Sequence, residues 1–159
     1  MLRQVAGDWG LDSELAGLVI DWSAQLHEIG LDVSHNGFQR HGAYVAENAD
    51  LPGFPRSEQM LLAFLIATQR SNFAKSRLKS LPANWQEKAL RLSILLRLAV
   101  LLNRSRGETD LWEADASAWD NTLELKFRTG WLCNNPLTIA DLEREQLIIE
   151  SVGYKLDFA

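Results

Sequence analysis

The sequence has little cysteine, no long apolar run and no secretion signal. Cys133 is the single cysteine among 159 residues, so no disulfide can form within the chain, and we expect it to be a small buried residue. Charged residues interrupt the apolar runs well short of the roughly 20 residues that cross a bilayer. The N-terminal MLRQVAGDWG lacks the basic, apolar and small-residue order of a signal peptide. These absences predict a cytoplasmic protein with no membrane segment.

Motifs for self-contained catalysis are also missing. The chain contains no G-x-x-x-x-G-K-[ST], no G-x-G-x-x-G and no G-x-S-x-G. Cys133 has no activating base next to it in the sequence, which argues against a nucleophilic role. We therefore expect no catalytic residue in this chain.

Acidic residues are scarce in the middle third of the chain. Met1–Pro55 carries two basic and eight acidic residues, and Gly107–Ala159 carries four basic and eleven acidic ones. Arg56–Arg106 carries ten basic residues and only two acidic ones, a local net charge of +8 in a chain whose total is −5. The negative total argues against a general nucleic-acid binder. The basic segment, by contrast, can concentrate polyanions.

Apolar periodicity predicts helices over the first two thirds of the chain. The predicted helices lie in LDSELAGLVIDWSAQLHEIG, about Asn36–Asn48, EQMLLAFLIATQR, and WQEKALRLSILLRLAVLLNRSR, which is the longest. The expected caps are Asp12 or Ser13 for the first helix, which Gly30 stops, Ser57 for the third, and a capping box of Asn84 and Glu87 for the longest.

The pattern changes after Gly107. DLWEAD and NTLELKF alternate apolar and polar residues around ASAWD, which predicts a hairpin. NNPLTIADLEREQLIIES predicts a helix with Asn135 as cap and Pro136 in first position, and GYKLDF predicts a strand. We expect a mainly α protein: a helical domain over residues 1–106, followed by a small ββαβ unit over residues 107–159.

The three histidines of the chain, His27, His35 and His41, lie in QLHEIGLDVSHNGFQRH. The pair His27 and Glu28 resembles the His-Asp pair of helical metal phosphohydrolases, which also need an earlier histidine and a late aspartate. No histidine precedes His27, and LAVLLNRSR offers the neutral amide of Asn103. We interpret His27, Glu28, His41 and Asn103 as a degenerate cluster without metal, in which His27 and His41 bond buried backbone or each other. The alternative is a stand-alone metal phosphohydrolase that uses His27, Glu28 and His41.

Cationic side chains near the basic segment are the candidate ligand-binding residues. Arg70, Lys75, Arg77 and Lys79 lie in the loop-like RSNFAKSRLKS, Arg104 and Arg106 lie at the end of the longest helix, and His35 and Arg40 are further candidates. The alternative is a solvated helix surface whose last-turn arginines stabilise the helix dipole.

Three short motifs, LHEIG, SHNGFQRHGAY and NADLPGF, occur in order and are followed by LRLAVLLNRSR and DLEREQ. In these motifs the chain resembles the C-terminal region of the bacterial exopolyphosphatase and guanosine pentaphosphate phosphatase (Ppx/GppA) family. The resemblance implies a helical His-Asp (HD)-domain-like bundle, degenerate in its metal ligands, followed by a small αβ unit. It also implies that catalysis belongs to N-terminal actin-like lobes that use Mg²⁺, and that this chain has no cofactor of its own.

We accordingly expect the C-terminal part of an exopolyphosphatase, which is not catalytic alone. Its expected partners are inorganic polyphosphate, the N-terminal catalytic lobes and a second copy in a homodimer, with no membrane and no nucleic acid. Two alternatives stay open: the corresponding region of a guanosine pentaphosphate phosphatase, and a pure interaction module.

Overall fold

The computed structural model describes residues 1–103 and 114–159 of the chain. These residues form two compact units. The helical unit is Asp12–Arg97, and the mixed unit combines Met1–Leu11 with Leu98–Ala159. The domain boundary expected between residues 106 and 107 lies outside the described residues and stays a prediction. Within the described ranges, no helix is long and apolar enough to cross a bilayer.

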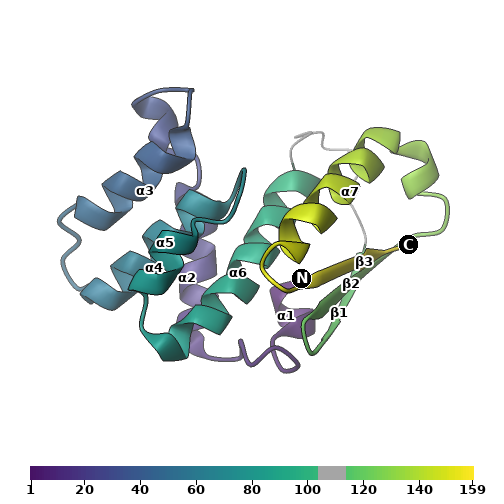
Figure 1. Cartoon of the computed structure of the whole chain (residues 1–159), viewed down its shortest axis with the longest axis horizontal. Coiled ribbons are helices and arrows are strands. Elements are labelled where there is room, and N and C mark those ends of the chain that lie inside the picture. The colour runs from purple at the N-terminus through teal and green to yellow at the C-terminus, as the bar shows by residue number, and fades with distance from the viewer. Residues whose placement is uncertain (104–113) are drawn as a thin grey trace. The chain divides into compact units, whose positions relative to one another are not determined.

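The helical unit contains the four predicted helices, a short 3₁₀ helix and one further α-helix (Figure 1). Its elements are α2 (Glu14–Leu26), the 3₁₀ helix η1 (Ile29–Asp32), α3 (Phe38–Asn48), α4 (Arg56–Thr68), α5 (Lys75–Ser80) and α6 (Ala83–Leu102), which continues into the mixed unit. Helix α5 corrects the sequence interpretation, because it lies in the basic stretch that we expected to be a loop. Its six residues contain no glycine or proline, so nothing breaks the helical turn.

Of the three N-caps predicted for the helical unit, one is confirmed and two are wrong, and α2 ends at Leu26, before the predicted stop at Gly30. Ser13 caps α2, accepting a hydrogen bond from the Ala16 N–H at 3.3 Å. Helix α4 has Pro55 at its N-cap position, so Ser57 is already inside the helix. Helix α6 begins at Ala83, so Asn84 is inside its first turn. Both helices begin directly after a proline, whose fixed φ suits entry into a helix, and the helices therefore start earlier than the polar caps suggested.

The core of the helical unit forms where α3 packs on α4. Helix α4 is buried at every residue from Leu61 to Thr68, since its apolar residues surround the helix and do not form a single stripe. The central cluster comprises Ala43, Ala46, Leu62, Ala63, Ile66 and Ala67. Trp22 and Phe54 pack on the edge of this cluster with their rings 4.4 Å apart. Small alanines on α3 let the two helices approach closely.

Two motif glycines allow η1 and α3 to touch. A Cβ on Gly30 would lie 1.9 Å from the Phe38 carbonyl oxygen and 2.5 Å from the Gly42 nitrogen. A Cβ on Gly42 would lie 3.2 Å from the Ile29 Cγ2 atom of η1 and 3.0 Å from the Ile66 Cγ2 atom of α4. The glycines of LHEIG and RHGAY therefore serve close backbone packing.

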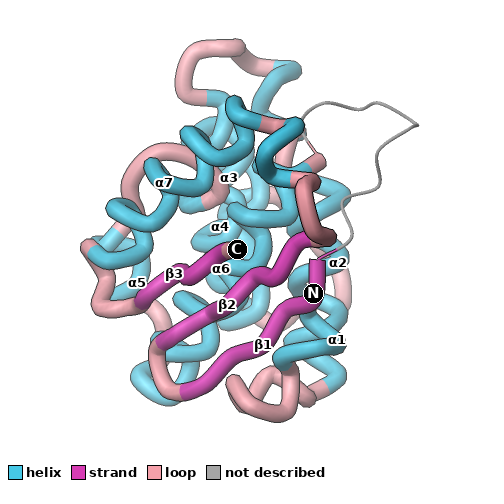
Figure 2. The backbone as a smooth tube through the Cα atoms, turned by 90° about the vertical axis from the view of Figure 1, so that its right-hand side faces the viewer, coloured by secondary structure: helices cyan, strands magenta, loops and turns pink. Residues whose placement is uncertain are grey.

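The mixed unit contains a three-stranded sheet and a long helix that packs against its edge strand (Figure 2). Its elements are α1 (Leu2–Val5), β1 (Ala114–Trp119), β2 (Thr122–Phe127), the 3₁₀ helix η2 (Leu132–Asn134), α7 (Pro136–Glu150) and β3 (Lys155–Phe158). Strand β2 is central, antiparallel to β1 and parallel to β3, which α7 connects to it. The predicted hairpin, helix and final strand are confirmed, although ASAW belongs to β1 and the turn falls at Asp120–Asn121. The chain is thus mainly helical with a small sheet.

The first residues of the chain complete the mixed unit. Trp9 is fully buried, and its indole Nε1–H donates to the Asp120 carbonyl at 3.1 Å. Its ring meets Tyr154 edge-on at 5.8 Å between centroids. Cys133, in contrast, is exposed, so the expectation that it is buried is wrong. It lies in the short η2 helix, where none of the three residues is buried.

Candidate anion-binding site

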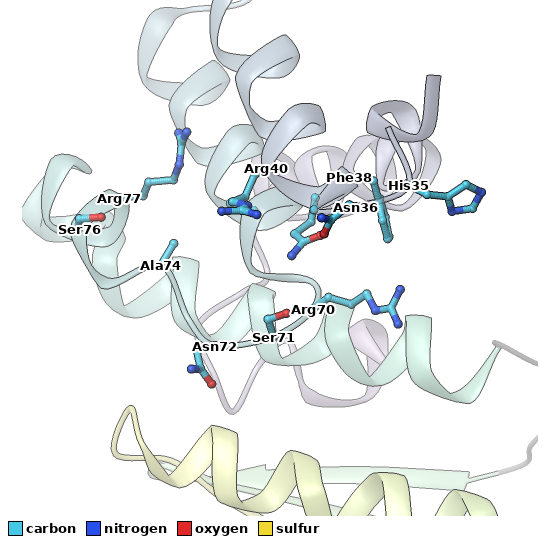
Figure 3. Close-up of a pocket in the computed structure, with 13 residues that line it drawn as sticks. His35, Asn36, Phe38, Arg40, Arg70, Ser71, Asn72, Ala74, Ser76 and Arg77 are labelled. Carbon is cyan, nitrogen blue, oxygen red and sulfur yellow. The ribbon is translucent and has the colours of Figure 1, made fainter. Parts of the chain in front are cut away.

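A pocket of about 700 Å³ lies within the helical unit. It is formed by the turn before α3, the first turn of α3, the connector between α4 and α5, and the start of α5 (Figure 3). Its lining residues are His35, Asn36, Gly37, Phe38, Gln39, Arg40, Ala67, Arg70, Ser71, Asn72, Ala74, Ser76 and Arg77. Cationic and neutral polar side chains dominate the lining.

The turn SHNG shapes the first wall. Gly37 has φ +69°, a left-handed conformation that glycine adopts without strain, and it occupies the N-cap position of α3. The Asn36 N–H donates to the Ser34 Oγ at 3.3 Å. The chain turns sharply here, so that Asn36 lies near Arg40 of the first turn of α3, whereas the His35 ring points away from Arg40 (Figure 3).

The connector between α4 and α5 forms the opposite wall and is anchored to the interior. Arg97 is 1% exposed, donates from Nη1 to the Thr68 carbonyl, and has its guanidinium 5.1 Å from the centre of the buried Phe73 ring. Gln69 donates to the His27 carbonyl. Ser71 has φ +61°, which costs a residue with a side chain about 1 kcal/mol or more. These anchors at both ends of the connector hold its strained conformation.

The charges that line the pocket have one sign. Arg40, Arg70 and Arg77 line it together with His35, and no carboxylate occurs among its described lining residues. Arg70 lies over the Phe38 ring at 5.6 Å, so its stem and guanidinium plane are supported. Within residues 1–103 and 114–159, neither Arg40 nor Arg70 forms an ion pair.

Arg77 differs from these two arginines because a carboxylate holds it. Its Nη1 lies 2.5 Å from the Glu47 Oε2, and the other Glu47 oxygen lies 3.9 Å from Arg56 Nη2. Glu47 itself is not one of the lining residues named above. Part of the Arg77 charge is therefore neutralised from outside the pocket.

The structure brings together four of the predicted binding residues. His35, Arg40, Arg70 and Arg77 line the pocket. Lys75 and Lys79 lie exposed on α5 and are not among its described lining residues. Arg104 and Arg106 lie outside the described residues. Sequence reasoning missed the neutral donors Asn36, Gln39, Ser71, Asn72 and Ser76, although each lies within five residues of a predicted cation.

The histidine cluster does not assemble as a metal site in the described residues. His27 Nδ1 bonds the Ala24 carbonyl at 2.7 Å, one turn back, and its Nε2 lies 3.9 Å from the Glu28 Oε1. Asn103 belongs to the mixed unit and donates to the Ala99 carbonyl at 2.8 Å. Across the described ranges, no three His, Cys, Asp or Glu side chains are grouped so as to hold a metal. The stand-alone metal phosphohydrolase lacks a ligand set in this part of the chain.

The helical unit thus carries a pocket lined by cationic and neutral polar side chains, and such a lining is suited to binding an anion. Residues 2–146 match the family model described as Ppx/GppA phosphatase, domain III. The chain therefore belongs to the Ppx/GppA phosphatase family and corresponds to its domain III.

Curated relatives agree with this assignment. The chain is 36% identical over 133 residues to the guanosine-5'-triphosphate,3'-diphosphate pyrophosphatase of Pseudoalteromonas translucida, which covers 84% of this chain and 27% of the relative. It is 33% identical over 160 residues to the protein of the same name from Vibrio atlanticus, covering 99% of the chain and 31% of the relative. The Vibrio vulnificus protein of the same name is 32% identical over 157 residues, which cover 98% of this chain and 31% of that protein. The chain thus spans about a third of the length of these relatives.

Proposed function

We propose that this chain is the C-terminal region of a Ppx/GppA phosphatase and holds the phosphate-rich substrate in its basic pocket. Hydrolysis of the terminal phosphate is assigned to Mg²⁺-dependent N-terminal lobes, which the family resemblance implies and which are the chain's first partner. The observation that carries the proposal is that Arg40, Arg70, Arg77 and His35 line one pocket, which has no carboxylate among its described lining residues.

The pocket attracts the phosphate groups of the substrate and positions them. Arginine guanidinium groups bind phosphate oxygens in pairs, which orients a phosphate group as well as attracting it. A concave site lined by one sign of charge also raises the local concentration of anions of the opposite sign. Substrate held in this way would stay near the catalytic lobes between successive hydrolytic steps.

Two substrates remain candidates for the whole enzyme. Inorganic polyphosphate fits a region in which cations occur from Arg40 to Lys79. Guanosine pentaphosphate gains support from the names of the three relatives described above. Assays of the full-length protein against both substrates would decide between them.

Titration of this chain with long-chain polyphosphate at several salt concentrations tests the proposal. Three engaged arginines should give a slope of log K against log salt of about −2, by analogy with about −0.7 per phosphate for single-stranded nucleic acids. Failure to bind any phosphate-rich anion at low salt would overturn the proposal.

We also propose that the helical unit is an HD-type fold that has lost its metal ligands. The adjacency of His27 and Glu28 in LHEIG supports the relationship, and the absence of a three-ligand group among the described side chains supports the loss. Elemental analysis of protein purified without chelator tests it. About one transition metal per chain would contradict it.

Homodimer formation is a second proposal, favoured by apolar residues on α7. Leu137 is 83% exposed and Leu147 is 69% exposed, although both are large apolar side chains. An interface with a second copy would remove them from water. Light scattering on the chain should give the mass of a dimer, and replacing both leucines with Gln should return it to the mass of a monomer. A monomeric mass for the unmodified chain would contradict it.

A further inference from the structure

We propose that the pocket is a focal site for one short phosphate run of two or three groups, and not one segment of a long cationic track. The ligand chemistry is shared by free tripolyphosphate and by the triphosphate of a nucleotide. This inference rests on the proposed function, because it specifies which anion the same pocket holds.

The cations are concentrated at one place. Arg40 comes from α3, Arg70 from the connector and Arg77 from α5, and all three line the same cavity. Lys75 and Lys79 share α5 with Arg77, yet they are exposed and are not described as lining the pocket. A track for a linear polymer would use the lysines of α5 as well as its arginine.

The size of the cavity also suits a small ligand. Its volume of about 700 Å³ lies within the range of about 300–1,000 Å³ that is usual for small-molecule sites. Such a volume can enclose a few phosphate groups on several sides. A long polymer would leave most of its length outside this cavity.

The donor set matches phosphate oxygens. Arg40 and Arg70 have no carboxylate partner in the described part of the chain, so each can offer a two-pronged guanidinium to a phosphate. The neutral side chains of Asn36, Gln39, Ser71, Asn72 and Ser76 add donors without adding charge. The positive charge of two unpaired arginines and one paired arginine matches the negative charge of a short phosphate run better than that of a single phosphate or of a long chain.

Calorimetric titration of this chain with tripolyphosphate, long-chain polyphosphate and GTP tests the inference. We expect one tripolyphosphate per chain. We also expect long-chain polyphosphate, with its concentration expressed as three-phosphate segments, to bind within about threefold of tripolyphosphate. Replacing Arg40 or Arg70 with Gln should weaken tripolyphosphate about tenfold and reduce the salt slope by about 0.7.

Matched variants separate a focal site from a general cationic surface. Lys88→Gln removes one positive charge at an exposed position of α6 and should change the affinity less than twofold. Lys75→Gln and Lys79→Gln should also have effects well below those of Arg40→Gln and Arg70→Gln. Circular dichroism melts confirm that each variant is folded.

The possible outcomes are distinct. Equal affinity for tripolyphosphate and GTP would show that the site recognises the phosphates alone. Tighter binding of GTP would show that the phosphate run belongs to a nucleotide. Both outcomes support the inference. Polyphosphate that binds while tripolyphosphate does not, or lysine variants that lose as much affinity as arginine variants, would overturn the focal site and leave the proposed function standing. Loss of binding to every phosphate compound would overturn both.

Discussion

Glu47 controls how much positive charge Arg77 presents to the pocket. The two side chains are 2.5 Å apart and each is about one-third exposed, so the pair is screened by solvent only in part. Arg56 lies 3.9 Å from the same carboxylate. A bound phosphate must therefore compete with Glu47 for Arg77, whereas it meets no such competition at Arg40 or Arg70 within the described residues.

Replacing Glu47 with Gln should raise the affinity for tripolyphosphate about three- to tenfold at low salt. The neutral amide leaves Arg77 fully charged and available, and the gain should shrink as salt screens the charge. Calorimetric titration at two salt concentrations measures it. Glu58→Gln, which removes a carboxylate of the same unit from the first turn of α4, should change the affinity less than twofold. Unchanged affinity in Glu47→Gln would show that Glu47 does not compete with the bound phosphate for Arg77.

His27 makes its side-chain hydrogen bond locally, to the Ala24 carbonyl. Replacing His27 with Ala should therefore lower the free energy of unfolding by about 0.5–1.5 kcal/mol. The bond from Gln69 to the His27 carbonyl involves backbone, so it survives the substitution and the connector keeps its anchor. Urea denaturation measures the free energy of unfolding. Titration with tripolyphosphate measures the affinity, which should be unchanged. Lost binding at unchanged stability would show that the histidine contacts ligand.

At the scale of elements, the contact between η1 and α3 supports the wall of the pocket. Gly30 lies against the Phe38 backbone, and Phe38 is the first residue of α3 and a lining residue. The connector on the other side is held by Arg97 and Phe73. The position of the pocket thus depends on packing between elements as much as on the cations themselves.

Gly30→Ala should lower the free energy of unfolding by about 2 kcal/mol or more, because the new Cβ would meet backbone at 1.9 Å. Gly17→Ala is the matched control. Gly17 lies within α2, and a Cβ added to it would have nothing within 4 Å, so alanine there should stabilise the chain by about 0.5–1 kcal/mol. Urea unfolding of the two variants should give shifts of opposite sign. A Gly30→Ala protein as stable as the original would contradict the close contact.

At the scale of the whole molecule, the ends of the chain meet in one unit. Met1–Leu11 belongs to the mixed unit although it precedes the helical unit in sequence. Trp9 is the main anchor of this segment, through the Asp120 carbonyl and the Tyr154 ring. The mixed unit therefore requires residues from both ends of the chain.

Trp9→Ala should lower the free energy of unfolding by about 3–5 kcal/mol, since it removes a fully buried large side chain and leaves a cavity. Trp119→Ala, at a position 47% exposed, should cost less than about 1 kcal/mol. Thermal melts of both variants provide the comparison. If Trp9→Ala and Trp119→Ala lower the free energy of unfolding by similar small amounts, the N-terminal segment contributes little to the stability of the mixed unit.

Local signals in the sequence determined much of the fold. Asn135 and Pro136 mark the start of α7, and the alternation in NTLELKF marks β2, since both signals act within a few residues. The basic middle segment, and therefore the polyanion hypothesis, was also visible in composition alone. Helix α5 escaped prediction because a six-residue basic stretch carries no apolar period.

Only the tertiary structure decided which cations act together. Arg40 and Arg70 are 30 residues apart, and they line one cavity because α3 packs on α4. Arg97 has the same charge but is buried under the connector, and Arg77 is paired with Glu47 from another helix. Composition gives each arginine the same charge, whereas burial and pairing determine how much of that charge an anion can reach. These are long-range properties, set by contacts between elements, which no local pattern contains.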